Sequence, residues 1–266
     1  MKETKMLVFD VDGTLYDPQH HEIPSSAIKA IHEAKEKGIL FVIATGRAHY
    51  GLGKALNDLK PDYILADNGA VVVDHNGNII SHHDFSKEDT QRIIDFTNQF
   101  EAGLIWKFLD HMYIYSHPEK VDWLMGQINS DIGREPFIFN PQQDRHFLDL
   151  PQSCSLHAIP EDVERELIPH TDLDFLPFSE QGYDVVVKGI NKGVGLNDLL
   201  TFLKIDPEEV MCFGDNHNDM EMMELVGKAV AMGNAIDKIK EIADYVTKPV
   251  DQDGIYHALQ HFKIID

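Results

Sequence analysis

The stretch Met6-Leu7-Val8-Phe9-Asp10-Val11-Asp12-Gly13-Thr14 decides the fold of this chain. Its first four residues form a continuous apolar run, which is typical of a short strand buried on both faces of a parallel sheet. Two carboxylates, Asp10 and Asp12, follow directly, and Gly13 then lets the backbone turn sharply. We therefore predict that both acidic side chains lie at the carboxyl end of a buried strand, where open parallel sheets bind their ligands.

Strand and helix patterns alternate along the first third of the chain. Residues 24–37 carry apolar side chains at helical spacing, and Gly38 follows as the expected C-terminal cap. Buried-strand patterns stand at residues 39–44 and 63–66, and a hairpin pattern at residues 71–80. Alternation with short connections predicts a parallel sheet with helices on both faces.

The last third of the chain returns to this alternation, whereas the middle mixes paired strands with helices. We predict a helix at residues 193–203 and short strands at residues 210–213, 229–231 and 245–247. The mixed middle is typical of an α+β module. The predicted fold class is therefore α/β, with a Rossmann-like parallel-sheet core at residues 1–83 and 185–266 and an inserted α+β domain at residues 84–184.

The composition counts against several classes of partner. The chain has 266 residues, of which 23 are Lys or Arg and 45 are Asp or Glu, so its formal net charge is −22. This excess of acid, without a basic stripe, counts against binding to nucleic acid or to an anionic membrane, but it does not exclude a small anionic substrate. Two cysteines give no disulfide framework, and no leader or membrane-spanning run is apparent. We expect a soluble cytoplasmic protein that is a monomer or a small homo-oligomer.

The Asp10 and Asp12 pair suits phosphoryl transfer. One carboxylate can attack phosphorus as a nucleophile, and the other can give a proton to the leaving oxygen and later take one from water. Two other readings of the pair are a calcium loop and a solvated turn. A calcium loop of the EF-hand type needs glycine at its sixth position, whereas Gly13 is the fourth residue counted from Asp10.

Two further clusters could bind an anion. Thr45, Gly46 and Arg47 follow the second strand, where a hydroxyl and free backbone N–H groups make an anion seat, although this pattern alone is more typical of a helix N-cap followed by an exposed arginine. Lys192 opens the late helix and could neutralise a carboxylate and a phosphoryl group. Lys188 competes with it for that role, and a surface lysine is the usual alternative.

The cluster at residues 214–219, Gly-Asp-Asn-His-Asn-Asp, follows the strand at residues 210–213. Carboxylate and amide oxygens after a strand are typical of a site for a hard cation such as Mg²⁺. Asp215 could supply ligands together with Asp10 and the backbone carbonyl of Asp12. The alternative is an Asx-rich turn that caps the next helix, a role that suits Asp219 in part.

The four clusters together carry a family resemblance. They stand in order as DVDGT at 10–14, TGR at 45–47, NKG at 191–193 and GDNHND at 214–219. This combination resembles the haloacid dehalogenase superfamily of phosphohydrolases, and most closely its Cof-type subfamily with a type IIB cap. In that subfamily the cap is inserted between the second and third motifs, and the resemblance covers the chain from end to end.

The resemblance implies a role for each matching residue. Asp10 matches the nucleophile and Asp12 the acid/base residue. Lys192 matches the charge-neutralising lysine, since it directly precedes a glycine at a helix start. The implied metal ligands are Asp10, Asp12 through its carbonyl, and Asp215. The implied phosphate-binding residues are Thr45, Gly46, Lys192 and Asn218, and the secondary positions are Asp219, which orients the site, Arg47, which reaches phosphate or forms a salt bridge, and Asn68, which orients a loop.

The resemblance implies a Mg²⁺-dependent phosphatase. It would hydrolyse small phosphorylated metabolites (sugar phosphates, nucleotides or cofactor phosphates) through an aspartyl-phosphate intermediate. A phosphosugar mutase on the same core is the main alternative, and a non-catalytic phosphoester sensor is another, although the presence of both Asp10 and Asp12 counts against the sensor. The cap would contact the leaving group and so set the specificity. Its candidate side chains for this contact are Trp106, Lys107, His111, Tyr113, Tyr115, Trp123 and Arg134. For each of them taken singly, a place in the core or on the ordinary surface is the more typical role.

Overall fold

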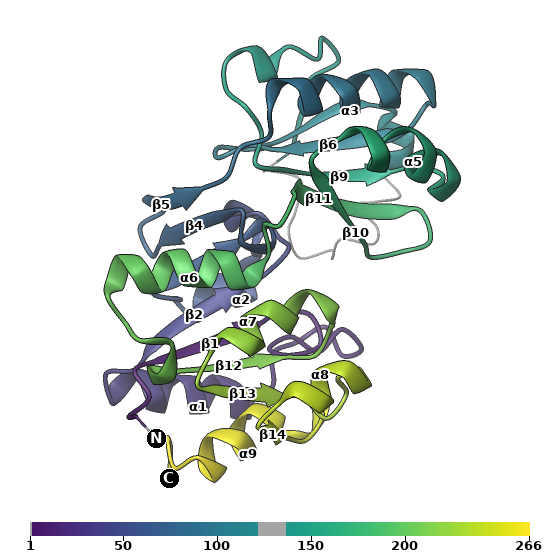
Figure 1. Cartoon of the computed structure of the whole chain (residues 1–266). Coiled ribbons are helices and arrows are strands. Elements are labelled where there is room, and N and C mark those ends of the chain that lie inside the picture. The colour runs from purple at the N-terminus through teal and green to yellow at the C-terminus, as the bar shows by residue number, and fades with distance from the viewer. Residues whose placement is uncertain (1, 122–136) are drawn as a thin grey trace. The chain divides into compact units, whose positions relative to one another are not determined.

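The computed structural model describes residues 2–121 and 137–266 and divides the chain into two compact units (Figure 1). The core unit consists of residues 1–45, 55–81 and 191–266, and the inserted unit of residues 46–54 and 82–190. A short segment, residues 46–54, therefore belongs with the inserted unit although both of its flanks belong to the core unit. Trp123 and Arg134, which the sequence suggested as leaving-group contacts, lie outside the described residues.

The core unit is built on an eight-stranded sheet with β1 near its middle. In order across the sheet the strands are β14 (Tyr245–Val246), β13 (Lys228–Ala231), β12 (Val210–Gly214), β1 (Met6–Asp10), β2 (Leu40–Ala44), β3 (Tyr63–Ala66), β4 (Val71–Asp74) and β5 (Ile79–His82). The pairs from β14 to β3 are parallel, and β4 pairs with β3 in the antiparallel sense. The predicted α/β class with a parallel-sheet core is confirmed.

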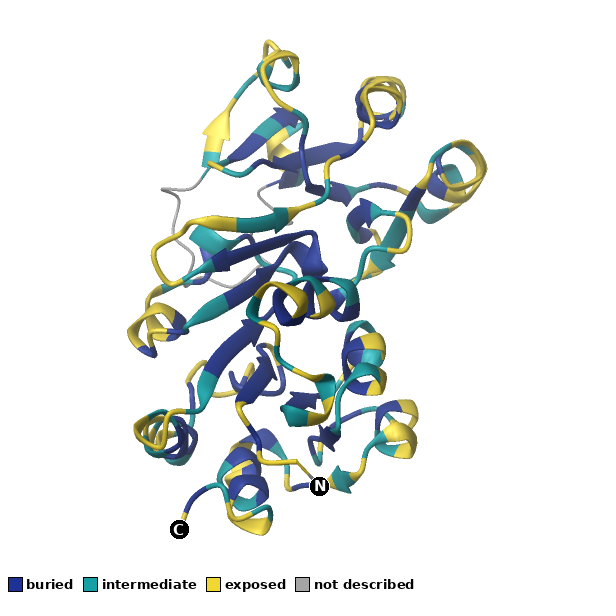
Figure 2. Ribbon diagram, turned by 60° about the vertical axis from the view of Figure 1, so that its left-hand side comes forward, coloured by how far each residue is buried: buried dark blue, intermediate teal, exposed yellow. Residues whose placement is uncertain are grey.

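Helices pack against the strands of this sheet. The α-helices are α1 (Ser25–Glu36), α2 (Lys54–Asp58), α6 (Lys192–Leu203), α7 (Met220–Leu225), α8 (Asp237–Ile242) and α9 (Gly254–His261). Met6 and Val8 of β1 pack in one buried cluster with Leu196 of α6. Successive side chains of a strand point to opposite faces, so Leu7 and Phe9 lie on the other face, and the Phe9 ring stacks on Phe213 at 4.5 Å between centroids. The apolar run at residues 6–9 is thus buried on both faces, as its pattern predicted. Figure 2 shows buried residues, in dark blue, concentrated in strands, and exposed residues, in yellow, mainly on loops and helices.

The inserted unit has a six-stranded, mostly antiparallel sheet. In order, its strands are β10 (Leu173–Pro177), β11 (Gly182–Val187), β9 (Ser153–His157), β6 (Gly103–Lys107), β7 (Met112–Ser116) and β8 (Phe137–Phe139), and only the β7–β8 pair is parallel. Helices α3 (Lys87–Gln99) and α5 (Pro160–Glu166) supply Ile93 and Val163 to the main buried cluster of this unit. Ser86 caps α3 by accepting the Asp89 N–H, because a hydroxyl at that position satisfies an otherwise unpaired backbone donor.

Three aromatic side chains of the inserted unit are used for packing. Trp106, Tyr113 and Tyr115 all belong to the buried cluster, and Trp106 has no exposed surface. Burial of such a side chain contributes roughly 1.5–3 kcal/mol to folding. These three residues therefore form part of the core of the inserted unit, which is one of the two more typical roles that the sequence favoured for them.

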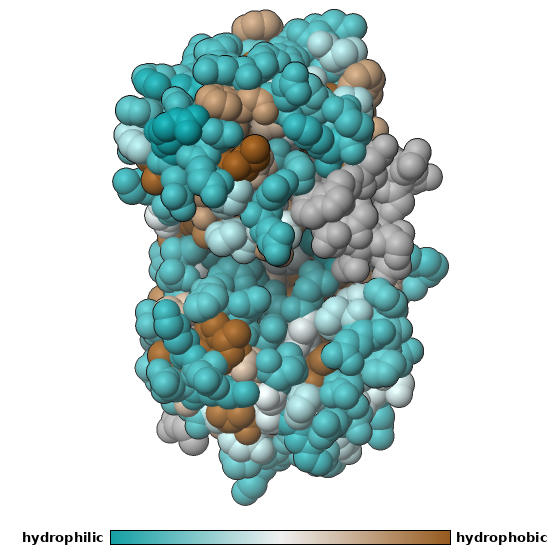
Figure 3. All heavy atoms as spheres, turned by 90° about the vertical axis from the view of Figure 1, so that its right-hand side faces the viewer, coloured by the Kyte–Doolittle hydropathy of each residue, from teal (hydrophilic) through white to brown (hydrophobic). Residues whose placement is uncertain are grey.

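Short 3₁₀ turns connect the main elements. They are η1 (His49–Gly51), η2 (Asp67–Gly69), η3 (Arg145–Phe147), η4 (Ile168–His170), η5 (Pro207–Glu209), η6 (His217–Asp219) and η7 (Val250–Gln252). Within the described part of the chain, the longest apolar helix is too short to cross a bilayer. The face drawn in Figure 3 is mostly hydrophilic, with hydrophobic residues in small separate groups.

Candidate active site

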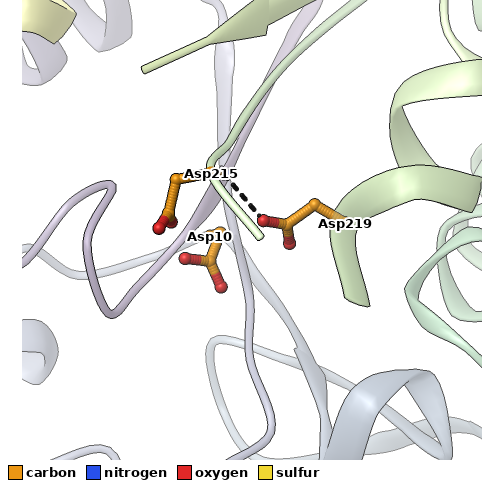
Figure 4. A group of neighbouring side chains, drawn as sticks. All are labelled: Asp10, Asp215 and Asp219. Carbon is orange, nitrogen blue, oxygen red and sulfur yellow. Dashed lines mark hydrogen bonds between the residues drawn. The ribbon is translucent and has the colours of Figure 1, made fainter. Parts of the chain in front are cut away.

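Three carboxylates meet where β1 and β12 end. Asp10 is the last residue of β1, Asp215 directly follows β12, and Asp219 lies in the η6 turn. One carboxylate oxygen from each lies within 4.8 Å of the others (Figure 4). Because β1 and β12 pair in parallel, their carboxyl ends lie side by side. This brings together Asp10 and Asp215, which are 205 positions apart in the sequence. The sequence-predicted acidic clusters of the two strand ends therefore occupy one place.

A fully buried lysine bridges two of the carboxylates. The Nζ of Lys192 donates to Asp10 Oδ1 at 2.5 Å and to Asp219 Oδ1 at 2.7 Å. Lys192 is the first residue of α6, where Asn191 caps the helix by accepting the Val194 N–H. Burying an ammonium group is costly unless it is paired, so the two carboxylates hold it there. Lys188, the other lysine that the sequence allowed, is exposed.

Asp219 uses both oxygens to hold its neighbours. While Oδ1 accepts from Lys192, Oδ2 accepts the backbone N–H groups of Asp215 at 2.9 Å and Asn216 at 3.1 Å. Gly214 makes this approach feasible, because a Cβ there would lie 2.7 Å from the Asp219 Cβ. Asp219 thus orients the lysine and the loop after β12.

The cluster carries an excess of negative charge. With every carboxylate counted as ionised, the formal charge of three carboxylates and one ammonium group is −2. Burial and the Asp219 charge raise the pKa of Asp10, and the same causes raise the pKa of Asp215 to about 6. Burial lowers the pKa of Lys192, but Asp10 and Asp219 raise it by more, so the net direction is upward and the ammonium group stays charged.

The donor set fits one divalent cation. Both Asp219 oxygens accept hydrogen bonds, whereas Asp10 and Asp215 each accept one from another residue at Oδ1, so these two are the better candidates for metal ligands. Thr14 orients Asp215 by donating its hydroxyl to Oδ1 at 2.8 Å. Mg²⁺ is usually held by one or two carboxylates, with water and phosphate oxygens completing the coordination. One Mg²⁺ ion, with a charge of +2, would balance the formal charge of −2 on this cluster.

The predicted phosphate seat has a framework of its own in the core unit. The Thr45 N–H donates to the Leu65 carbonyl, and the Thr45 carbonyl accepts the Asn68 N–H at 2.9 Å. Asn68 in turn accepts the Asn218 side-chain amide at 3.0 Å. Thr45, Asn68 and Asn218, which the sequence suggested separately, therefore form one hydrogen-bonded chain.

The remaining predicted residues belong to different units: Asp12 to the core unit, and Gly46 and Arg47 to the inserted unit. Asp12 is exposed, next to Gly13, whose φ of +94° and close approach to Asp215 (2.5 Å from a Cβ to Oδ2) exclude a side chain there. Gly46 and Arg47 belong to the inserted unit, where the Arg47 guanidinium donates to the Leu52 carbonyl at 3.1 Å.

Two contributing residues had no role in the sequence reasoning. Thr14 stands inside the first motif, yet its bond to Asp215 appears only in the folded chain. Asn234 donates to the Gly13 carbonyl at 2.8 Å and accepts the Val250 N–H at 2.9 Å. Asn234 lies three residues after the end of β13. Its polar side chain just beyond a strand end is the sequence signal that would have indicated a role in this site.

Comparison with known proteins agrees with this geometry. The family of haloacid dehalogenase-like hydrolases matches residues 7–259. The phosphatase YcsE of Bacillus subtilis (strain 168), which acts on 5-amino-6-(5-phospho-D-ribitylamino)uracil, is 28% identical over 98% of this chain and 96% of its own. The phosphatase BT1666 from Bacteroides thetaiotaomicron has a solved structure with a TM-score of 0.85, 28% identity and coverage of 99% and 96%. For the subclass IIB sugar phosphatase BT4131 the TM-score is 0.84, with 29% identity and coverage of 98% and 100%.

The chain belongs to the haloacid dehalogenase-like hydrolases, of the Cof type. Within that family it is a phosphoric monoester hydrolase, in agreement with the enzyme class that the motifs predicted.

Proposed function

We propose that this enzyme is a Mg²⁺-dependent phosphatase of small phosphorylated metabolites, with Asp10 as the nucleophile. The observation that carries the proposal is the fully buried Lys192, which holds the Asp10 carboxylate in a fixed position at the end of β1. A sugar phosphate or a phosphorylated nucleotide-like compound is the substrate class best supported, because BT4131 is a sugar phosphatase and YcsE acts on a phosphoribityl uracil.

In the first step an Asp10 carboxylate oxygen forms a bond to phosphorus, and the bond from phosphorus to the ester oxygen breaks. The leaving oxygen takes a proton from Asp12. The Lys192 ammonium group offsets part of the repulsion between the Asp10 carboxylate and the anionic ester. Thr45, Gly46 and Asn218 would donate hydrogen bonds to the phosphoryl oxygens.

In the second step Asp12 takes a proton from water, and the water oxygen bonds to phosphorus. The bond between Asp10 and phosphorus then breaks and releases inorganic phosphate. Asp10 and Asp215, with the Asp12 carbonyl, would hold the metal ion, which when bound supplies positive charge near the phosphoryl group. Asp219 contributes indirectly, since it keeps Lys192 and the loop after β12 in place.

Phosphate release from a panel of sugar phosphates, nucleotides and cofactor phosphates tests the proposal. Release should require Mg²⁺, stop in EDTA and be lost in Asp10→Asn. A phosphoenzyme that hydroxylamine cleaves should accumulate in wild type during turnover and be absent in Asp10→Asn. Phosphate release that survives in Asp10→Asn would overturn the assignment of the nucleophile, and an isomerised sugar phosphate without net release would indicate a mutase.

Two general properties complete the proposal. Cys154 and Cys212 are buried and form no disulfide, which supports a cytoplasmic enzyme. The net charge of −22 supports a small metabolite, and not a nucleic acid, as the partner. We propose a monomer or small homo-oligomer.

A further inference from the structure

Lys107 is a buried lysine in the inserted unit, and it donates hydrogen bonds to residues on two separate segments. It ends β6 and has only 4% of its surface exposed. Its Nζ donates to Asp184 Oδ1 on β11 at 3.0 Å and to the backbone carbonyl of Gly46 at 3.0 Å. The Ser155 hydroxyl, on the intervening strand β9, donates to the same Asp184 oxygen at 2.9 Å. The lysine is therefore held in one position by the sheet.

The ion pair of Lys107 and Asp184 lies on the sheet face opposite the main buried cluster of the inserted unit. Side chains alternate along a strand, and the neighbours Trp106, Cys154 and Val185 all point into the cluster that α3 and α5 cover. Lys107 and Asp184 point the other way. A buried ion pair is rarely more stabilising than apolar packing of the same volume, so stability alone is a weak reason for a lysine at this place.

The Gly46 carbonyl connects this pair to the segment 46–54. That segment has a second anchor on the same unit, because the Tyr50 hydroxyl donates to the Phe108 carbonyl at 2.8 Å. The Tyr50 ring also packs on the small cluster of Ile105, Met112 and Val121. Residues 46–54 are accordingly part of the inserted unit, whereas Thr45 is bonded to Leu65 and Asn68 of the core unit.

We propose that Lys107, oriented by Asp184, is a positioning residue that sets the backbone of the loop directly after Thr45 and thereby its affinity for phosphate. The peptide unit is planar, so a bond to the Gly46 carbonyl also fixes the direction of the Arg47 N–H. Glycine has more backbone freedom than any other residue type. Without the bond from Lys107 to the Gly46 carbonyl, the loop would therefore sample more conformations. The affinity part of this inference rests on the proposed function, in which Thr45 and Gly46 bind the phosphoryl group.

Lys107→Met tests the proposal, because it keeps most of the side-chain volume and removes the charge and donors. Hydrogen exchange of the amides in residues 46–54 should become faster in the variant. Binding of inorganic phosphate in Mg²⁺, measured by calorimetry, should weaken by about tenfold, as expected for loss of a charged hydrogen bond. In turnover, KM should rise by more than kcat falls. Asp184→Asn should shift the same quantities in the same direction and carries the test if Lys107→Met fails to fold.

Lys120→Met is the matched control. Lys120 also donates to a backbone carbonyl of the inserted unit, that of Glu101, but on a segment remote in sequence from Thr45. Exchange in residues 46–54 and phosphate affinity should stay at the wild-type values in this control. A Lys107→Met protein that loses thermal stability yet keeps wild-type loop exchange and phosphate affinity would overturn the inference.

The exchange measurement needs no turnover, so the two proposals fail separately. If wild type releases no phosphate from any ester, the proposed function fails, while loop exchange in the variants still decides whether Lys107 orders the segment. If wild type is an active phosphatase and loop exchange is unchanged in both variants, only the inference about Lys107 fails.

Discussion

Lys192 pairs with two buried carboxylates, and this makes its side chain hard to replace. The ammonium group has no exposed surface and bonds to Asp10 and Asp219. Removing one partner of a buried ion pair leaves an uncompensated charge, which costs much more than the pair itself contributes. We therefore expect the stability of this site and the proposed activity to depend on the same Nζ atom.

Lys192→Met should abolish phosphate release and lower the free energy of unfolding by about 3 kcal/mol at pH 7. Asp10, whose pKa burial and the Asp219 charge already raise, would then lack its ammonium partner, so protonation of Asp10 at acid pH should restore part of the loss. Denaturant unfolding at pH 7 and pH 5 measures both effects. Lys188→Met is the control, because Lys188 is an exposed lysine four residues earlier, and it should behave as wild type. Equal losses in both variants would contradict the bridging role.

Asp215 should make the metal-free protein less stable as pH rises. Burial and Asp219 raise its folded pKa to about 6, whereas an unfolded aspartate has a pKa of about 3.9. The folded state therefore binds more protons than the unfolded state between about pH 4 and pH 6, and its stability falls as pH rises through that window.

Asp215→Asn should thus raise the Tm of the metal-free protein at pH 7, by a free energy of about 1–3 kcal/mol. Asparagine keeps an oxygen for the Thr14 hydroxyl but carries no charge. Thermal unfolding in EDTA gives the measurement, and the variant should also lose the stabilisation by Mg²⁺. Asp206→Asn should show no such gain, because the bond from Lys2 lowers the pKa of Asp206. A lower Tm for Asp215→Asn in EDTA would show that the carboxylate is not under electrostatic strain.

At the scale of elements, the start of α6 is pressed against the η2 turn. Gly69 has a φ of +92°, and a Cβ on it would lie 2.2 Å from the Asn191 carbonyl oxygen. Gly195 of α6 approaches the same turn, with 2.7 Å from a Cβ to the Gly69 Cα. Two glycines thus let the helix that carries Lys192 lie close to the turn that carries Asn68.

Gly69→Ala should displace the start of α6 and cost about 3 kcal/mol or more, because backbone strain and a backbone clash act together. Phosphatase activity should fall with it. Gly77→Ala is the matched control, since Gly77 has a similar φ of +79° but nothing within 4 Å of its Cβ position. The control should lose only about 1 kcal/mol from strain. Denaturant unfolding compares the two, and equal losses would mean that the clash is relieved at no cost.

The loop after β13 braces both acidic strand ends. Asn234 bonds to the Gly13 carbonyl, and the Met232 and Ile236 N–H groups donate to the carbonyls of Gly214 and Asp215. This loop therefore connects the first and fourth motifs, which supply the predicted nucleophile and metal ligand.

Asn234→Ala should lower kcat by about tenfold or more with little change in KM, because misplaced reacting groups slow the chemical step. Asn234→Asp keeps the acceptor for the Val250 N–H but replaces the donor to Gly13 by an anionic oxygen that repels the Gly13 carbonyl, so it should show at least the same loss of kcat. Steady-state kinetics and Tm give the comparison, with Asn78→Ala in the exposed hairpin turn as the control. Wild-type kcat in both Asn234 variants would contradict the bracing role.

At the scale of the whole molecule, the charge of −22 acts on stability as well as on partner choice. Self-repulsion destabilises the compact state and is screened by salt, with a Debye length of about 10 Å at 0.1 M ionic strength. Specific binding of Mg²⁺ adds stability on top of that screening, in proportion to the logarithm of its concentration over Kd.

The Tm should therefore rise when KCl is raised from low ionic strength, and MgCl₂ at the same ionic strength should raise it further. The extra increment should vanish in Asp10→Asn and Asp215→Asn, which remove the proposed ligands, while the KCl effect remains. Differential scanning calorimetry measures both. A MgCl₂ increment that persists in both variants would place the cation elsewhere on the acidic surface.

The sequence by itself determined the α/β class and the strand ends at which chemistry is placed. Apolar runs such as residues 6–9, helical spacing and the polar residues after each strand are local signals, and each reports on a few neighbouring residues. Parallel strands then bring their carboxyl ends to one edge, so the clustering of Asp10 with Asp215 followed from the pattern.

Only the tertiary structure decided which side chains meet. Spacing along the chain left Lys188 and Lys192 equal, and the fold places Lys192 against Asp10, 182 positions away. It also showed the bonds from Thr14 to Asp215 and from Asn234 to Gly13, over 201 and 221 positions. Such contacts depend on how strands and loops from distant parts of the chain pack, and their distances are set by close packing between elements and not by any local pattern.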